Sequence, residues 1–184
     1  GGGNARSPRI ACSVMGSRAI ITAGASGIGL VVSRTLVVQG YSVAICDVDR
    51  AALNVAKESL GLACATTCDV TDTGAMQSFV DEAMIALGGL DTVIANAGTG
   101  GPTAPFEEIV ASDWQDTLAV NLKGQFNLLK PAIPHLKDNG SCSVVLMSSV
   151  AGRLGYPMRA PYAVAKWGVI GLKETLAMEL GPHG

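Results

Sequence analysis

Short apolar runs alternate with longer segments of mixed polar and apolar residues along most of the chain. The short runs are bounded by glycine, serine or aspartate, which is typical of strands that are buried on both faces. They predict strands at residues 19–22, 42–46, 62–67, 92–95 and 143–147. The longer segments predict helices at residues 28–39, 50–60, 73–87, 112–130 and 161–181.

Residues that favour helix ends support these boundaries. Asp49 fits the N-cap position of the second helix, and Gly61 fits the C-terminal cap of the same helix. Ser112 with Gln115 matches a capping box, which predicts that the long helix begins there. Pro161 suits the first turn of the last helix.

The strict alternation of strands and helices predicts the fold. It implies an α/β protein of the Rossmann type, with a doubly wound parallel sheet and helices on both faces. The last helix is not followed by a strand, so the fold is expected to be truncated after the fifth strand and its helix. Residues 1–16 are expected to be a flexible leader or a cloning remnant, and residues 17–184 a single domain.

Composition excludes several classes of function. A hydrophobic content of 48%, a charged content of 15% and a mean hydropathy of +0.37 exclude a disordered chain. The net charge is −2 and there is no basic run, so neither nucleic acid nor a membrane surface is an expected partner. Residues 19–33 lack charge, but they contain three glycines and are too short to span a bilayer, so they predict a buried strand and helix.

The five cysteines are an odd number and are dispersed, which indicates reduced thiols in a cytoplasmic protein. The closest pair is Cys64 and Cys68, and a four-residue step along a strand would separate them by about 13 Å. One metal ion could not bridge that distance, so no metal site is predicted.

A glycine-rich turn joins the first strand to the first helix, at Thr22-Ala23-Gly24-Ala25-Ser26-Gly27-Ile28-Gly29. Glycines there would let the backbone approach a pyrophosphate at the helix N-terminus. Tight strand-to-helix turns also use glycine without any ligand, but the position in the first unit favours nucleotide binding.

Acidic residues follow the second and third strands. Asp47 ends the second strand, where a carboxylate accepts hydrogen bonds from the ribose hydroxyls of an adenosine and repels a 2′-phosphate. We therefore expect NAD rather than NADP. Asp69 ends the third strand and either binds the adenine amino group or is a solvated loop residue.

A strand and a helix near the end of the chain carry the candidate catalytic groups. The strand ends at Ser149, and the helix places Tyr162 and Lys166 four residues apart on one face. At about 4 Å and an effective dielectric of about 20, a lysine ammonium attracts a phenolate by roughly 4 kcal/mol. Such a tyrosine is suited to general acid/base catalysis. The alternative is a tyrosine and a lysine paired on an exposed helix face.

Asn121 lies in the middle of a predicted helix among apolar neighbours. Asparagine is unfavourable there unless its amide finds a partner. A structural hydrogen bond and a contact in the active site are both consistent with that position.

Taken together, the glycine turn, the Asn96-Ala97-Gly98 segment, the helical Asn121, the strand-end Ser149 and the Tyr-x-x-x-Lys motif resemble the classical short-chain dehydrogenase/reductase family from about residue 17 to residue 184. The resemblance implies that Tyr162 is the catalytic acid/base, that Ser149 orients the substrate oxygen, and that Asn121 anchors a water in a proton relay. It implies that Lys166 holds the nicotinamide ribose and favours the tyrosine's phenolate.

The resemblance also implies the NAD site. Its residues would be Gly24, Ser26, Gly27, Ile28, Gly29, Asp47, Asp69, Val70, Asn96, Ala97, Gly98, Tyr162 and Lys166. One departure concerns the turn itself, because Ala23 occupies the first glycine position of the family's pattern.

The expected function is an NAD(H)-dependent oxidoreductase that interconverts a secondary alcohol and a ketone. An NADPH-dependent ketoreductase of acyl-chain synthesis and a non-catalytic dinucleotide-binding protein are the alternatives. Residues 150–160 are expected to form one wall of the substrate pocket, and their mixture of apolar and basic side chains permits many substrates. Family members commonly pair through the helices that correspond to residues 113–130 and 162–180, so a homodimer or homotetramer is expected.

Overall fold

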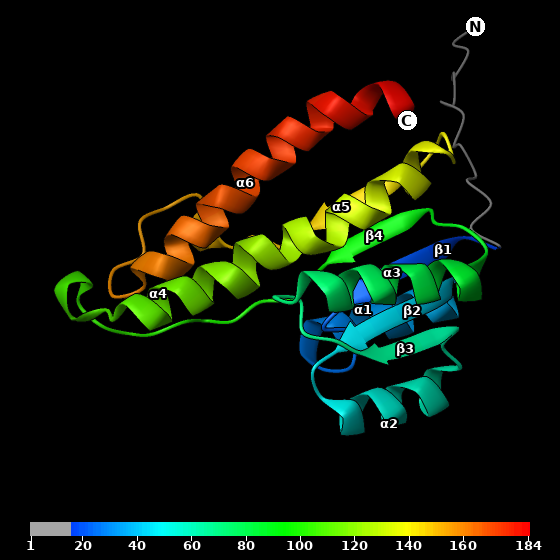
Figure 1. The fold of residues 1–184 in the computed structure, drawn as a ribbon, viewed down its shortest axis with the longest axis horizontal. Coiled ribbons are helices and arrows are strands. Elements are labelled where there is room, and N and C mark those ends of the chain that lie inside the picture. The colour runs from blue at the N-terminus through cyan, green and yellow to red at the C-terminus, as the bar shows by residue number, and fades with distance from the viewer. Residues whose placement is uncertain (1–15) are drawn as a thin grey trace, which may run out of the picture.

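A single parallel sheet organises the chain, in the strand order β3-β2-β1-β4-β5 (Figure 1). The computed structural model describes residues 16–184, so the leader predicted for residues 1–16 lies outside the described residues except for Gly16. The strands are β1 (Arg18–Thr22), β2 (Ser42–Asp47), β3 (Cys64–Thr67), β4 (Thr92–Ala95) and β5 (Ser143–Leu146). The chain builds outward from β1 to β3 and then crosses over to β4, which places the topological switch point between β1 and β4.

Helices cover both faces of the sheet, as the Rossmann-type prediction requires. The longer helices are α1 (Gly27–Val38), α2 (Arg50–Leu60), α3 (Thr73–Leu87), α4 (Ala111–Leu118), α5 (Gly124–Lys137) and α6 (Ala160–Leu180). One core cluster joins alternate strand residues such as Ile20 to Phe79 of α3 and Leu128 of α5. The other joins the intervening strand residues, such as Ile21, to the helices α1 and α2, including Leu53. No helix within residues 16–184 has both the length and the apolar character needed to cross a membrane.

The predicted boundaries of the long helix are wrong at both ends. The helix begins at Ala111 with Val110 at the N-cap position, so Ser112 lies in the first turn and does not form a capping box. A π-helical turn, η2 (Ala119–Lys123), joins α4 to α5, and α5 continues to Lys137 through two internal prolines. Burial of residues such as Leu136 against the sheet favours the helix more than the lost proline N–H bonds oppose it.

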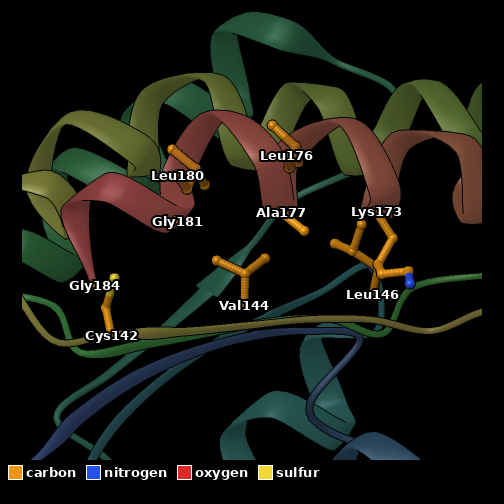
Figure 2. A pocket seen from close by; sticks show the side chains of 9 residues that line it. All are labelled: Cys142, Val144, Leu146, Lys173, Leu176, Ala177, Leu180, Gly181 and Gly184. Carbon is orange, nitrogen blue, oxygen red and sulfur yellow. The ribbon is translucent and has the colours of Figure 1, made fainter.

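An apolar groove runs between the edge strand β5 and helix α6. It has a volume of about 240 Å³ and is lined by Cys142, Val144, Leu146, Lys173, Leu176, Ala177, Leu180, Gly181 and Gly184. Figure 2 shows Val144 and Leu146 pointing from β5 toward α6. The residues of β5 alternate between exposed and half-buried, so this edge strand is only partly covered.

Candidate active site

The turn between β1 and α1 brings two backbone segments into contact. A Cβ on Gly29 would lie 2.0 Å from the carbonyl oxygen of Ala23, and one on Gly24 would lie 2.7 Å from Ile45 of β2. Gly27 has open space around it but a φ of +50°, so glycine is needed there for backbone freedom. Ala23 also has a φ of +50°, and alanine adopts that conformation at a cost of about 1–2 kcal/mol. The turn therefore keeps its left-handed step without the family's first glycine.

The N-terminus of α1 faces outward from this turn. Ser26 is the N-cap residue, and its side chain makes no capping hydrogen bond in the described structure. Ser26, Gly27 and Ile28 are all exposed. Because the first N–H groups of a helix have no partner within the helix, these residues can present backbone donors to an anion.

Two side chains hold the glycine turn against the end of β4. The Thr22 hydroxyl accepts hydrogen bonds from the N–H groups of Asn96 at 3.0 Å and Ala97 at 3.1 Å. The Asn96 amide donates to the carbonyl oxygens of Thr22 at 3.0 Å and Ala23 at 3.1 Å. These bonds fix the two loops that flank the switch point.

A cavity of about 280 Å³ opens at the carboxyl ends of the strands. It is lined by Ala23, Asp47, Val48, Cys68, Asp69, Val70, Ala97, Gly98, Thr99 and Val120. The lining comes from the ends of β1, β2, β3 and β4 and from the π-helical turn. Ligands of doubly wound sheets bind at this place, outside the switch point.

Asp47 and Asp69 both line the cavity, but their carboxylates are held differently. Asp47 is 7% exposed, and its two oxygens accept one backbone N–H each, from Ala25 at 3.1 Å and from Asp49 at 3.2 Å. Since each carboxylate oxygen has two lone pairs, both oxygens keep capacity for a ribose hydroxyl. Asp69 accepts from the N–H of Thr71 at 2.8 Å and so also stabilises its own turn.

Helix α6 places Lys166 and Tyr162 on the same face. Lys166 is only 4% exposed, and its Nζ lies 5.6 Å from the centre of the Tyr162 ring. The same Nζ donates to the carbonyl oxygen of Met147, just beyond β5, at 2.8 Å. Burial lowers the pKa of Lys166. The ammonium is therefore held beside the phenol by an anchor on the sheet and is not a solvated surface charge.

The two serines that follow β5 form different hydrogen bonds. Ser148 donates from Oγ to the carbonyl oxygen of Lys166 at 2.9 Å, which ties the strand end to α6. Ser149 accepts the N–H of Ala151 at 3.2 Å, and its side chain is half-buried. Its hydroxyl proton remains able to donate to a substrate oxygen.

Asn121 is fully buried in the π-helical turn, and its amide binds the loop after β4. Nδ2 donates to the carbonyl oxygens of Thr99 and Thr117, each at 2.9 Å, and Oδ1 accepts from the N–H of Thr99 at 3.2 Å. A Cβ on Gly98 would lie 2.9 Å from Asn121 Oδ1 and 3.4 Å from Lys166 Nζ. The π-helical turn, the β4 loop and the lysine thus meet at Gly98.

The structure brings most of the residues predicted from the sequence to one edge of the sheet, in two groups. Tyr162, Lys166 and Asn121 lie near the ends of β4 and β5, whereas Asp47, Asp69, Val70, Ala97 and Gly98 line the cavity. Asn96 does not line the cavity, because its amide faces the turn. Sequence reasoning missed Thr22 and Ser148. A polar residue that ends an apolar strand and is then buried is the signal that could have identified Thr22.

A parallel sheet with a glycine turn at its first strand-to-helix connection and a cavity at its switch point defines the class of dinucleotide-binding α/β proteins. A protein-family model described as short chain dehydrogenase matches residues 17–184. The chain therefore belongs to the short-chain dehydrogenase family.

Individual relatives agree with this family. A 2-dehydro-3-deoxy-L-rhamnonate dehydrogenase (NAD(+)) from Sphingomonas sp. strain SKA58 is 33% identical over 92% of this chain and 68% of its own. An L-fucose dehydrogenase from Oryctolagus cuniculus is 32% identical over 92% of this chain and 59% of its own. The chain therefore spans about two thirds or less of the length of these relatives.

Solved structures show the same fold. An NAD+-bound xylitol dehydrogenase superposes with a TM-score of 0.89 and 30% identity, covering 93% of this chain and 67% of that one. A carveol dehydrogenase from Mycobacterium avium in complex with NAD gives a TM-score of 0.88 and 34% identity, covering 93% and 68%.

Proposed function

We propose that the protein is an NAD(H)-dependent oxidoreductase that interconverts a secondary alcohol and a ketone. The observation that carries the proposal is the buried Lys166 ammonium, anchored on Met147 and 5.6 Å from the centre of the Tyr162 ring. This pair lies at the same edge of the sheet as the cavity at the switch point. A phenol beside a fixed positive charge is suited to proton transfer at neutral pH.

In the direction of oxidation, the Tyr162 phenolate would take the proton of the substrate hydroxyl. The Ser149 hydroxyl would donate a hydrogen bond to the carbonyl oxygen that develops. When bound, NAD supplies the nicotinamide ring that accepts the hydride from the carbinol carbon. Lys166 would stabilise the phenolate by charge, and Asn121 would hold the β4 loop beside it.

The residues present fit NAD. The exposed start of α1, at Ser26, Gly27 and Ile28, offers backbone donors for a pyrophosphate. Asp47 keeps lone pairs for the adenosine ribose, and its charge disfavours a 2′-phosphate. None of the described residues that line the cavity is a lysine or an arginine that could offset this charge. These features support NAD over NADP, and hence a dehydrogenase over an NADPH-dependent ketoreductase.

We also propose a homodimer that forms across the faces of α4, the π-helical turn and α6. These elements, with the start of α5, line an exposed groove of about 650 Å³ with Trp114, Gln115, Leu118, Ala119, Leu122, Lys123, Phe126 and Leu172. Phe126 is 51% exposed there and lies in one groove with Trp114, Leu118, Leu122 and Leu172, and contiguous apolar patches of this kind mark interaction sites.

The proposed function is tested by NADH formation with the complete gene product across a panel of secondary alcohols, with NADP assayed in parallel. Turnover with NAD that exceeds turnover with NADP is the expected result. A strong preference for NADP would contradict the role given to Asp47 and favour the ketoreductase. NAD binding without turnover on any alcohol would favour a non-catalytic dinucleotide-binding protein.

A further inference from the structure

Two loops meet at the start of α6, the helix that carries Tyr162: residues 99–105 after β4 and residues 153–159 before α6. Arg159 joins them, because its Nη1 donates to the carbonyl oxygen of Gly100 at 2.7 Å. A second bond runs in parallel, from the N–H of Ala104 to the carbonyl oxygen of Met158 at 3.0 Å. A charge-assisted bond and a backbone bond thus connect loops that are far apart in the sequence.

The β4 loop is also bound at its start by the π-helical turn and α4. Thr99 is bound through both its N–H and its carbonyl oxygen by Asn121. Gly101 has a φ of +65° and packs against Thr117, where a Cβ would lie 2.5 Å from the hydroxyl oxygen. Arg159 therefore binds the loop next to the start that Asn121 already holds on the π-helical turn, and the bond from Ala104 to Met158 holds its far end.

Arg159 also lies at the start of α6, the helix that carries Tyr162. It is the N-cap residue of α6, and its carbonyl oxygen accepts the N–H of Ala163 at 2.9 Å. Met158, before it, has a φ of +65°, a conformation that a residue with a side chain keeps only when its surroundings hold it. Within the same loop, the Tyr156 ring lies 6.3 Å from the Tyr162 ring.

We propose that Arg159 is a positioning residue that locks the β4 loop to the loop before α6, so that both form one rigid wall beside Tyr162. The inference rests on the proposed function, since it concerns the cleft in which Tyr162 would act. The hydrogen bonds of the Arg159 guanidinium within residues 16–184 run from Nη1 to the carbonyl oxygens of Gly100 and Gly101, so the role inferred for it is to shape the wall.

Arg159→Met in the complete gene product tests this role. Because the β4 loop loses a charge-assisted bond, we expect the KM for the alcohol to rise by about 10-fold or more, with NAD affinity within about twofold of the parent. Hydrogen exchange of the amides at residues 100–104 should accelerate. Arg159→Lys can donate one of the bonds and should restore part of the change in KM. Arg34→Met is the matched control, because the Arg34 side chain is exposed on α1, outside both loops, and donates no hydrogen bond within residues 16–184.

Unchanged exchange at residues 100–104 in Arg159→Met would overturn the inference, as would a KM equal to that of Arg34→Met. Loss of NAD binding together with a large fall in melting temperature would also overturn it, because Arg159 would then hold the whole fold. Failure of the proposed function has a different signature. Absence of alcohol turnover in the parent would remove the KM comparison, and the exchange rates alone would then decide whether Arg159 fixes the loop.

Discussion

At the scale of single residues, two glycines of the same turn are required for different reasons, one for space and one for its backbone conformation. Gly29 is required for room, since the Ala23 carbonyl oxygen occupies the space where a side chain would begin. Gly27 is required for its backbone angle, since nothing lies within 4 Å of the position a Cβ would take. The two positions should therefore respond differently to the same substitution.

Gly29→Ala should destabilise the chain more than Gly27→Ala. The first substitution pushes a Cβ against backbone that cannot rotate away, which costs about 1–3 kcal/mol or more. The second costs about 1–2 kcal/mol, from a left-handed conformation that alanine disfavours. Urea denaturation of the 184-residue chain measures both changes in the free energy of unfolding. Equal losses for the two variants would contradict the close approach of α1 to the turn.

The pairing of Tyr162 with Lys166 was predictable because it depends only on helical spacing. The anchor of Lys166 on the Met147 carbonyl oxygen and the bond from Ser148 to the Lys166 carbonyl oxygen were not predictable. Both bonds join the end of β5 to α6, and they exist only because the fold brings those elements together. Spacing within one element can be read from a sequence, whereas contacts between elements need the packing.

At the scale of elements, the strands and most helices follow the sequence prediction closely. Helix α2 has the predicted bounds, and Asp49 caps it by accepting the N–H groups of Ala51 and Ala52. The exception is the helical run from Ala111 to Lys137. Its start lacks the predicted cap, and its end passes two prolines, because tertiary burial outweighs local preference there. The π-helical turn that holds Asn121 leaves no signal in the hydrophobic pattern.

The starts of β1 and β4 are tied by an ion pair that should make stability depend on pH. Arg18 donates to Asp91 from Nε at 2.7 Å, from Nη2 at 3.0 Å and from its backbone N–H at 2.7 Å. The hydrogen bond from the Arg18 guanidinium lowers the pKa of the Asp91 carboxyl, and the amide of Asn139 adds to this effect. A carboxyl with a lowered pKa stabilises the fold above its unfolded pKa of about 3.9, and this stabilisation is lost as the pH falls through the folded value.

Asp91→Asn should therefore lower the free energy of unfolding by about 1–2 kcal/mol at pH 7, since both side chains are largely shielded from water. The difference from the parent should shrink as the pH falls below about 4. Chemical denaturation across this range measures it. Asp138→Asn is the control, because its exposed carboxyl makes no side-chain hydrogen bond within residues 16–184. A difference that persists unchanged at low pH would show that charge is not the cause.

At the scale of the whole molecule, the parallel sheet gathers groups that are far apart in the sequence at one edge. Four strands that are neighbours in the sheet, β2, β1, β4 and β5, contribute to this edge: they carry Asp47, the glycine turn, the loop after β4 and the end of β5. The cavity at the switch point and the Tyr162–Lys166 pair lie at the same edge, which is the arrangement that the proposed hydride transfer needs, since the alcohol must contact both the proton acceptor and the cofactor.

The most direct test of this account is a comparison of Tyr162→Phe with the parent in the complete gene product, by NAD titration calorimetry and by NADH formation with an accepted alcohol. We predict NAD affinity within about twofold of the parent, with turnover lower by about 100-fold to 10,000-fold or more. Tyr41→Phe is the matched control and should keep turnover, because Tyr41 lies just before β2, at the opposite end of the strands from the site, and packs against the core beneath α1 and α2. Retained turnover in Tyr162→Phe would contradict the catalytic role, and loss of NAD binding would show that the tyrosine's role is structural.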